Sequence, residues 1–128
     1  MKLTFRPACR EDAAKLLEWR NDPNTRSMSK NDHAVEWCQH LQWLDARLAR
    51  REPKLFVGEL DGSLVCTYRI DGDEISYTVA PDQRGRGVCS AMLHYVVNTH
   101  GSMKAEIFER NVASIKAATR TGLQVLLI

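Results

Sequence analysis

The sequence predicts one α/β domain of the α+β kind, in which helices cover both faces of a mixed β-sheet. The chain has 128 residues, of which 44% are hydrophobic, so it is long enough to bury one substantial core. Strand-like and helix-like apolar patterns alternate along it, and no linker, repeat or low-complexity segment divides residues 1–128. Such alternation is typical of layered folds, and the predicted order of elements is β-α-α-β-β-β-α-β-α-β.

The N-terminal part is predicted to hold one strand and two helices. Leu3–Pro7 alternates weakly and ends at a proline, which favours a short strand. Apolar residues at helical spacing predict a helix over Arg10–Arg20, and residues 21–30 follow as a proline turn and an irregular stretch. A second helix is predicted to start around Ser29–Asp32 and to run to about Arg50.

The middle of the chain predicts three antiparallel strands in a meander. Lys54–Leu60 and Ser63–Ile70 are β-rich runs on either side of Asp61-Gly62, a dipeptide that favours a two-residue hairpin turn. Asp71-Gly72-Asp73 predicts a second tight turn of the same kind. It leads into a third strand, Glu74–Ala80.

The C-terminal part predicts a helix, a strand, a second helix and a last strand. An amphipathic helix follows the glycine-rich loop and ends at residues 100–102. Met103–Phe108 is a predicted strand, and Val112–Thr121 is a helix closed by Gly122 at its C′ position. The apolar run Leu123–Ile128 is the last predicted strand.

The composition limits the classes of function. With 18 Lys and Arg against 16 Asp and Glu, the net charge of +2 does not favour nucleic acid as a partner. No apolar run approaches a membrane span and no signal peptide opens the sequence, so we expect a cytoplasmic protein without a membrane partner. Cys9, Cys38, Cys66 and Cys89 form no Cys-x-x-Cys pair and no metal-ligand spacing with the histidines. They are expected to be reduced and buried, and no metal is expected.

The clearest functional pattern is the glycine-rich loop between the Glu74–Ala80 strand and the helix that follows. Gly85 and Gly87 leave space for backbone N–H groups to approach a ligand, and these donors lie where a helix begins. Arg84 and Arg86 add positive charge, so the pattern favours a phosphate-bearing ligand. A purely structural loop is the alternative. A Walker loop is absent, and the dinucleotide fingerprint would need a glycine where Ser90 stands.

Two motifs in this order resemble the GNAT N-acetyltransferase superfamily. Residues 79–81 and Arg84-Gly-Arg-Gly-Val-Cys89 resemble its acetyl-CoA signature, and Asn111-Val-Ala-Ser114 with Gly122-Leu123 resembles its second conserved block. The resemblance implies a single GNAT domain that uses acetyl-CoA as co-substrate.

By that resemblance, the cofactor lies along the loop and the strand before it. Val79 would pair with the pantetheine where its strand bulges and splays from the next one, and Asn111 and Ser114 would contact the cofactor from the other side. Asn111 could equally be a helix N-cap. The pyrophosphate is assigned to the backbone of Arg84, Gly85, Arg86, Gly87, Val88 and Cys89 and to the hydroxyl of Ser90.

The sequence departs from the family pattern at two positions. Cys89 replaces the usual glycine or alanine, and Ala118 stands where the family often has a tyrosine acid. A thiolate leaving group would then take its proton from another group or from water, or leave as the anion.

The acceptor side resembles the branch that acetylates nucleotide-linked amino sugars in the pseudaminic-acid pathway. The resemblance rests on Trp19-Arg-Asn-Asp-Pro23, Arg26 and His40-Leu-Gln-Trp43, and it is weaker for the ribosomal-protein N-terminal acetyltransferases. Each of these side chains could also serve packing or a solvated loop. The candidate acceptor-binding residues are Asn21, Arg26, His40 and Tyr77.

The predicted reaction is direct attack of an amine on the thioester in a ternary complex. The backbone N–H of Val79 is the expected oxyanion donor, and Asp73, Glu74 and Glu59 are the candidate bases, with surface charge as their alternative role. Strand alternation lets only one of Asp73 and Glu74 face the site. The expected acceptor is a small-molecule amine, with a protein N-terminus or a non-catalytic acetyl-CoA-binding module as alternatives. A homodimer that covers the edge of the last strand is a further expectation.

Overall fold

The computed structural model describes residues 2–30 and 32–128, and its centre is a six-stranded mixed sheet in the order β1-β2-β3-β4-β5-β6. The first four strands are antiparallel, and β5 and β6 run parallel to β4. At the first hairpin, Asp61 and Gly62 have φ values of 52° and 81°, as the predicted Asp-Gly turn requires. The strands are β1 (Leu3–Pro7), β2 (Leu55–Leu60), β3 (Ser63–Asp71), β4 (Glu74–Val79), β5 (Lys104–Ile107) and β6 (Gln124–Leu127).

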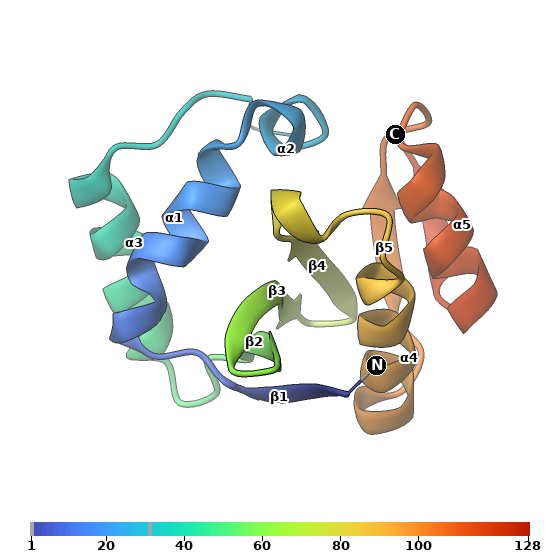
Figure 1. Ribbon diagram of the computed structural model, residues 1–128, viewed down its shortest axis with the longest axis horizontal. Helices are drawn as coiled ribbons and strands as arrows, with labels where there is room; N and C mark the ends of the chain where they lie inside the picture. The colour runs from blue at the N-terminus through green and yellow to red at the C-terminus, as the bar shows by residue number, and fades with distance from the viewer. Residues whose placement is uncertain (1, 31) are drawn as a thin grey trace.

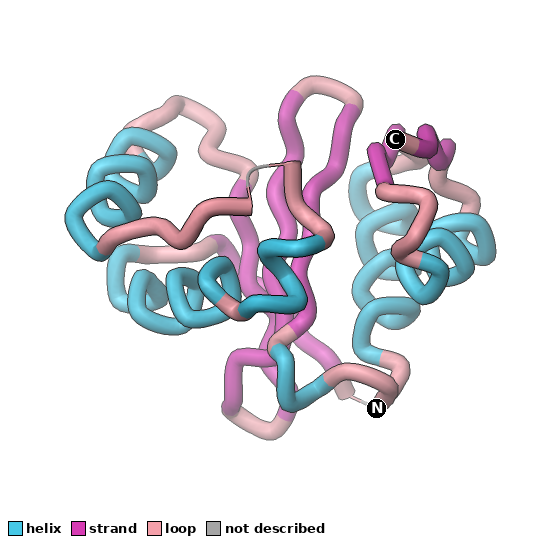
Figure 2. Tube along the Cα trace, turned by 90° about the horizontal axis from the view of Figure 1, so that it is seen from above, coloured by secondary structure: helices cyan, strands magenta, loops and turns pink. Residues whose placement is uncertain are grey.

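Helices cover both faces of this sheet, which confirms the predicted fold class (Figures 1 and 2). One face carries α1 (Ala13–Asn21), α2 (Pro23–Ser27) and α3 (Trp37–Leu48), and the other carries α4 (Val88–His100) and α5 (Val112–Thr121). Each face has its own buried apolar cluster. Short 3-10 turns, Arg10–Asp12 and Pro81–Gln83, precede α1 and the glycine loop.

The helix α2 was not predicted, so the predicted order of elements is wrong at this point. Asp22 accepts a hydrogen bond from the Thr25 backbone N–H at 3.0 Å, and Pro23 occupies the first helical position. A proline that cannot continue α1 is well suited to begin the next helix, because its missing N–H would have had no partner there.

The helix α3 begins later than predicted. It starts at Trp37 with Glu36 as its N-cap, and residue 31 of the predicted start lies outside the described residues. Its buried face is His40, Leu44 and Arg47, whereas the side chains of Trp37 and Cys38 are exposed. The prediction that all four cysteines are buried is therefore wrong. All four are free thiols, and only Cys66 is buried.

The strands β4 and β5 separate almost as soon as they meet. Their pairing is confined to Glu74 opposite Lys104, together with a 2.8 Å hydrogen bond from Lys104 N–H to Asp73 O. On its other side β4 keeps unbroken register with β3, so the predicted bulge in this strand is not observed. The irregularity lies between β2 and β3, at Gly58/Glu59. The separation leaves one edge of β4 without a strand partner over most of its length.

No helix within residues 2–30 and 32–128 has the length and apolar character needed to span a bilayer. In the same residues, no three His, Cys, Asp or Glu side chains gather as a metal site would require.

Candidate active site

The glycine loop delivers unpaired backbone donors to the start of α4. Gly87 is the N-cap with a φ of 82°, and Gly85 has a φ of 73°, a region of backbone conformation that favours glycine. The helical ladder begins with Ala91 N–H, which donates to Gly87 O at 3.1 Å. No acidic residue lies in the first turn of α4. The amides before Ala91 and the helix dipole therefore form a candidate site for an anion.

The free edge of β4 presents a second strip of backbone donors and acceptors. Ala80 N–H donates to Val65 O at 2.8 Å, so the facing residues Cys66 and Val79 form a non-hydrogen-bonded pair of the antiparallel ladder. The peptide groups of Val79, and by alternation those of Tyr77, therefore point away from β3, towards the gap left by β5. An extended chain could add there as an extra strand.

Two cavities flank this edge. The first, which we call the loop cavity, has a volume of about 400 Å³ and lies between the glycine loop, the end of β4 and the start of α5. All of the predicted cofactor residues except Arg86 line it. They are Val79, Arg84, Gly85, Gly87, Val88, Cys89, Ser90, Asn111 and Ser114.

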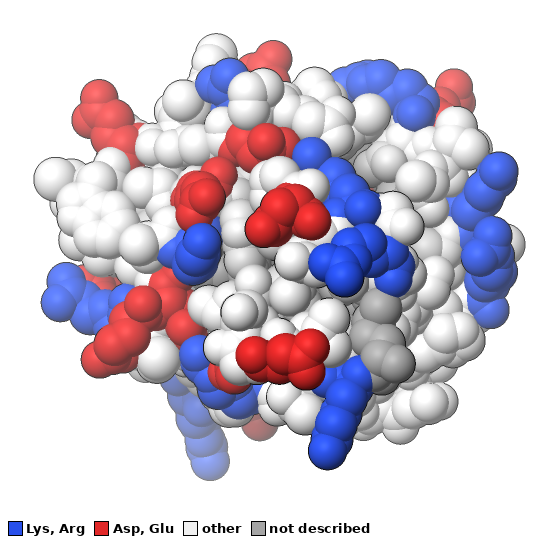
Figure 3. Space-filling view, in the orientation of Figure 1, with Lys and Arg blue, Asp and Glu red and all other residues white. Residues whose placement is uncertain are grey.

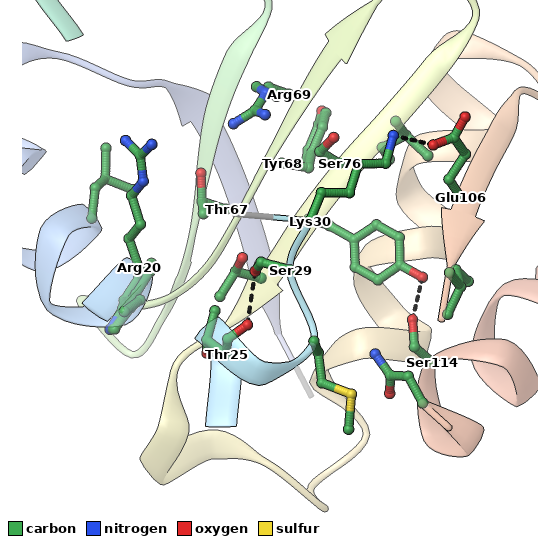
Figure 4. Close-up of a pocket in the computed structure, with 18 of the residues that line it drawn as sticks. Arg20, Thr25, Ser29, Lys30, Thr67, Tyr68, Arg69, Ser76, Glu106 and Ser114 are labelled. Carbon is green, nitrogen blue, oxygen red and sulfur yellow. Dashed lines mark hydrogen bonds and ion pairs between the residues drawn. The ribbon is translucent and has the colours of Figure 1, made fainter. Parts of the chain in front are cut away.

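The second, which we call the sheet cavity, has a volume of about 410 Å³ and lies over the face of the sheet that carries α1 and α3. The side chains of Thr67, Arg69, Ser76 and Thr78 project from β3 and β4 into it, as strand alternation requires (Figure 4). Its walls come from α1, α3 and β5, and the segment 25–30 borders it.

The two cavities meet at Tyr77, whose hydroxyl lies 2.5 Å from Ser114 Oγ (Figure 4). Burial raises the pKa of Tyr77 to about 12. This phenol therefore stays protonated at neutral pH and can donate a hydrogen bond or a proton where the cavities join.

The segment that contains α2 is fastened on both sides. Arg84 of the glycine loop donates to Asp22 Oδ2 at 2.9 Å and to Thr25 Oγ1 at 2.8 Å. Arg110 donates to the Ser27 carbonyl, and Lys30 forms an ion pair with Glu106 of β5 (Figure 4). The segment thus bridges the gap between β4 and β5 and borders both cavities.

Comparison with known proteins identifies the family. Residues 2–124 match the family model described as an acetyltransferase (GNAT) domain. The chain belongs to the GNAT acetyltransferase family. The family resemblance of the two motifs is therefore confirmed, whereas no comparison supports the amino-sugar branch. No curated protein matches the chain.

Solved structures share the fold at low sequence identity. The yncA protein of Salmonella typhimurium, with its cofactor acetyl-CoA, is 23% identical over 95% of this chain and 79% of its own, with a TM-score of 0.74. An N-acetyltransferase from Staphylococcus aureus Mu50 is 23% identical over 94% of this chain and 82% of its own, with a TM-score of 0.71. The aminoglycoside acetyltransferase AAC(6')-Ib, in complex with ribostamycin and coenzyme A, is 17% identical over 94% and 82%, with a TM-score of 0.73.

The candidate bases lie in different environments of this GNAT domain. Glu74 lines the sheet cavity. Asp73 is exposed and pairs with Lys104 at 3.1 Å. Glu59 accepts a 2.6 Å hydrogen bond from Arg6 and lines neither cavity. The structure also places in the sheet cavity a carboxylate that sequence reasoning missed, Glu106.

The acceptor candidates also separate. His40 is buried and lines the sheet cavity; its Nε2 lies 3.1 Å from Ala13 O, and its Nδ1 has no partner among the described residues. Burial, aided by the charge of Arg20, lowers the pKa of His40. Asn21 instead exchanges two 2.8 Å hydrogen bonds with the Val35 backbone, and Arg26 lines neither cavity.

The position of the usual tyrosine acid does not face either cavity. Ala118 is fully buried in the core between α5 and the sheet, whereas its neighbour Ala117 lines the loop cavity. Cys89 contributes a small, protonated side chain to the loop cavity, since burial raises the pKa of its thiol to about 11. Tyr77 lines both cavities, whereas the hydroxyl of Tyr68, which lines the sheet cavity, lies 2.9 Å from His100 Nε2.

Charges outside the cavities show no single dominant patch on the face in Figure 3, where Lys and Arg side chains are interspersed with Asp and Glu.

Proposed function

We propose that this GNAT domain transfers the acetyl group of acetyl-CoA to the primary amine of a small molecule. The observation that carries the proposal is the junction of two cavities at Tyr77, beside the unpaired edge of β4. The relatives support it, because yncA was solved with acetyl-CoA and AAC(6')-Ib with coenzyme A and an aminoglycoside. An acetyl thioester supplies an activated acyl group, so the protein must bind it, orient the amine and move protons.

The residues of the loop cavity fit acetyl-CoA. The amides at the start of α4, with the hydroxyl of Ser90, would hold the pyrophosphate. The free peptide groups of Tyr77 and Val79 would pair with the pantetheine amides as an added strand. Asn111 and Ser114 line the opposite wall.

This placement brings the thioester next to the groups that act on it. The Val79 N–H would donate to the carbonyl oxygen as the amine nitrogen attacks and negative charge develops. As the new C–N bond forms and the C–S bond breaks, the Tyr77 hydroxyl would donate its proton to the leaving thiolate, and the phenolate, being strongly basic, would regain a proton from water. Ser114 orients that hydroxyl through its 2.5 Å hydrogen bond.

The amine must also lose a proton, and two carboxylates line the sheet cavity, Glu74 and Glu106, the second of which is paired with Lys30. Glu74 lies five residues before Val79, about 16 Å away at the usual rise of a strand. Glu106 lies at the level of Ser76 along the strands, across the gap between β4 and β5, because Glu74 pairs with Lys104 and the two strands are parallel. We therefore rank Glu106 above Glu74, with water carrying the proton between amine and carboxylate.

The acceptor side favours a small molecule over a protein N-terminus. A volume of about 410 Å³ is in the usual range of small-ligand sites. A nucleotide-linked amino sugar remains a candidate within this proposal, since a phosphate group would suit the arginines that line the cavity.

The experiment combines cofactor binding with turnover. Ser90 is the third residue of α4, so Ser90→Glu should preserve the helix through its dipole while repelling the pyrophosphate. We expect its acetyl-CoA affinity, measured calorimetrically, to fall by about tenfold or more, and the neutral, similarly sized Ser90→Gln to lose much less. Equal affinities for the two variants would contradict the phosphate site.

Turnover with a panel of amines decides whether the domain is an enzyme. The proposal requires release of CoA that depends on the amine and an N-acetylated product identified by mass spectrometry. Tight acetyl-CoA binding without acetylation of any amine would instead support a non-catalytic binding module.

A further inference from the structure

Two arginines line the sheet cavity from different elements, Arg20 on α1 and Arg69 on β3. Each guanidinium carbon lies 5.5 Å from the ring centroid of Trp43, so one indole supports both groups. In Figure 4 the two guanidinium groups lie on the same side of the cavity, in the upper left of the view.

These charges are poorly neutralised by the protein. Arg20 forms no hydrogen bond or ion pair with any described residue, and its guanidinium packs over the ring of Trp43. Arg69 uses only its Nε, at 3.4 Å from Asp71 Oδ2, and the other oxygen of Asp71 already serves Arg47 and Arg50. One carboxylate is therefore shared among three arginines. Glu74, which also lines the cavity, attracts the charge of Arg69 without forming an ion pair with it, so most N–H donors of Arg20 and Arg69 are unused.

A structural arginine in the same protein looks different. Arg47 is buried, and its guanidinium donates to Pro53 O at 2.6 Å, to Asp71 Oδ1 at 2.6 Å and to Ile70 O at 3.0 Å. Arg20 and Arg69 lack such a set of acceptors. Their burial lowers the pKa of both groups, and the charge of Arg69 lowers that of Arg20 further. Two like charges held together in this way are stabilised when an anion joins them.

We infer that the acceptor amine carries an anionic group, a carboxylate or a phosphate, which binds between Arg20 and Arg69. This inference rests on the proposed acetyl transfer and adds the chemical class of its acceptor. Planar guanidinium groups match the oxygens of both anions.

The register of the sheet adds a constraint on length. Arg69 lies opposite Ser76, three residues before Val79, which is about 10 Å along the strand. The anion and the reacting amine are therefore separated by several bonds, more than in an α-amino acid that reacts at its α-amine.

The test uses two series of matched amines: ω-amino carboxylates of increasing length and ω-aminoalkyl phosphates, each compared with a neutral amide or alcohol of equal length. We expect kcat/KM to favour one anionic series over its neutral partners by about tenfold or more, with an optimum at intermediate length. The series that wins identifies the anion as carboxylate or phosphate.

Arginine variants connect this preference to the site. Arg20→Gln and Arg69→Gln should raise KM for the anionic amines by about tenfold, with little change in kcat or in KM for the neutral ones. Arg20→Lys should recover part of the loss. Arg120→Gln removes an exposed arginine of α5 that lines neither cavity, and it should change nothing.

A binding measurement separates this inference from the proposed reaction. An alkyl carboxylate and an alkyl phosphate without an amine are titrated calorimetrically into the protein saturated with CoA, so that the glycine loop is already occupied. Binding of one of them that Arg20→Gln abolishes supports the anion site even if no amine is acetylated. Equal turnover of anionic and neutral amines, with no anion binding, would overturn the inference and leave acetyl transfer standing.

Discussion

The loop cavity and the sheet cavity have nearly equal volumes, about 400 and 410 Å³, but different parts of the chain build them. The loop cavity is lined largely by backbone and small side chains, most of them from one continuous stretch between Tyr77 and Ser90. The sheet cavity is lined by large polar and charged side chains from α1, α3, β3, β4 and β5. A ligand common to the whole family can be held by backbone groups, whereas a particular acceptor must be recognised by side chains.

This difference also explains what each cavity tolerates. Cys89 in place of glycine or alanine leaves the backbone N–H groups at the start of α4 in place, so it is compatible with the proposed phosphate site. A change at Arg20 or Arg69 would alter the chemistry of the sheet cavity directly.

The largest effect is expected at Ala118, which lies on the face of α5 that packs into the core and not on the face that lines the loop cavity. Ala118→Tyr should lower the free energy of unfolding by about 3 kcal/mol or more, because a new ring must enter a close-packed core. It should not raise turnover. Urea denaturation and steady-state kinetics measure the two quantities.

Ala113 supplies the control, since it is exposed and lines the loop cavity. Ala113→Tyr should change the free energy of unfolding by only about 0.5 kcal/mol and weaken acetyl-CoA binding instead. A stable Ala118→Tyr protein with faster turnover would show that the usual tyrosine position does face the thioester.

The next largest effect is expected at the junction of the cavities. Tyr77→Phe removes the hydroxyl but keeps the ring, and kcat should fall by about tenfold or more if this group protonates the thiolate. The affinity for acetyl-CoA should change little. Ser114→Ala, which removes only the hydrogen-bond partner, should have a smaller effect on kcat, and unaltered kcat in Tyr77→Phe would exclude the phenol as the acid.

A smaller effect is expected from His40 as the pH falls. Burial holds its pKa below the usual 6.5, so below pH 6.5 the unfolded chain takes up a proton before the folded chain does. The free energy of unfolding should therefore fall on acidification, by at most about 1.4 kcal/mol per pH unit for this group. A neutral His40 also avoids charge repulsion with Arg20, which lines the same cavity.

His40→Gln isolates this contribution. The pKa of His100 is lowered as well, mainly by burial, and changes stability with the same sign. The pH dependence of wild-type stability must therefore be compared with that of the variant, measured by urea denaturation between pH 7.5 and 5.5. Identical slopes would mean that His40 does not resist protonation in the fold.

Most of the fold follows from local patterns in the sequence. The Asp-Gly turns set the meander, and the helix Val112–Thr121 has the bounds that its apolar spacing and Gly122 predict. The main errors lie in the segment 22–48. There Pro23 starts a helix instead of merely ending one, and tertiary packing buries His40 and Arg47 of α3 while leaving Trp37 exposed.

The residues of the loop cavity could be predicted from the sequence, whereas most of those of the sheet cavity could not. The glycine loop is contiguous, so its role can be read locally. Arg20, Arg69 and Glu106 carry no local pattern that marks them, because only the register of the strands and the packing of α1 bring them together. Alternation along β4 does separate Glu74 from Asp73, and it would also have placed Ser76 and Thr78 beside Glu74.

The smallest effect is expected where Arg84 links the glycine loop to α2. Arg84→Gln and Asp22→Asn, combined in a double-mutant cycle of unfolding free energies, should give a coupling energy of about 0.2–1 kcal/mol, since the pair is partly exposed. Asparagine keeps the N-cap hydrogen bond to Thr25, so the cycle reports the ion pair and not the loss of α2. The coupling should disappear in 1 M salt.

The same pair decides whether the two cavities communicate. While Asp22 holds Nη2 of Arg84 at 2.9 Å, that nitrogen is not available to a phosphate in the loop cavity, and the guanidinium is held at the α2 side. Asp22→Asn should therefore raise acetyl-CoA affinity by about two- to fivefold at low salt, and the increase should vanish in the Arg84→Gln background. If the affinity still rises when Arg84 is replaced, the effect comes from the change in net charge near the loop. If the rise disappears, cofactor binding competes with Asp22 for Arg84 and thereby affects the segment that borders the sheet cavity.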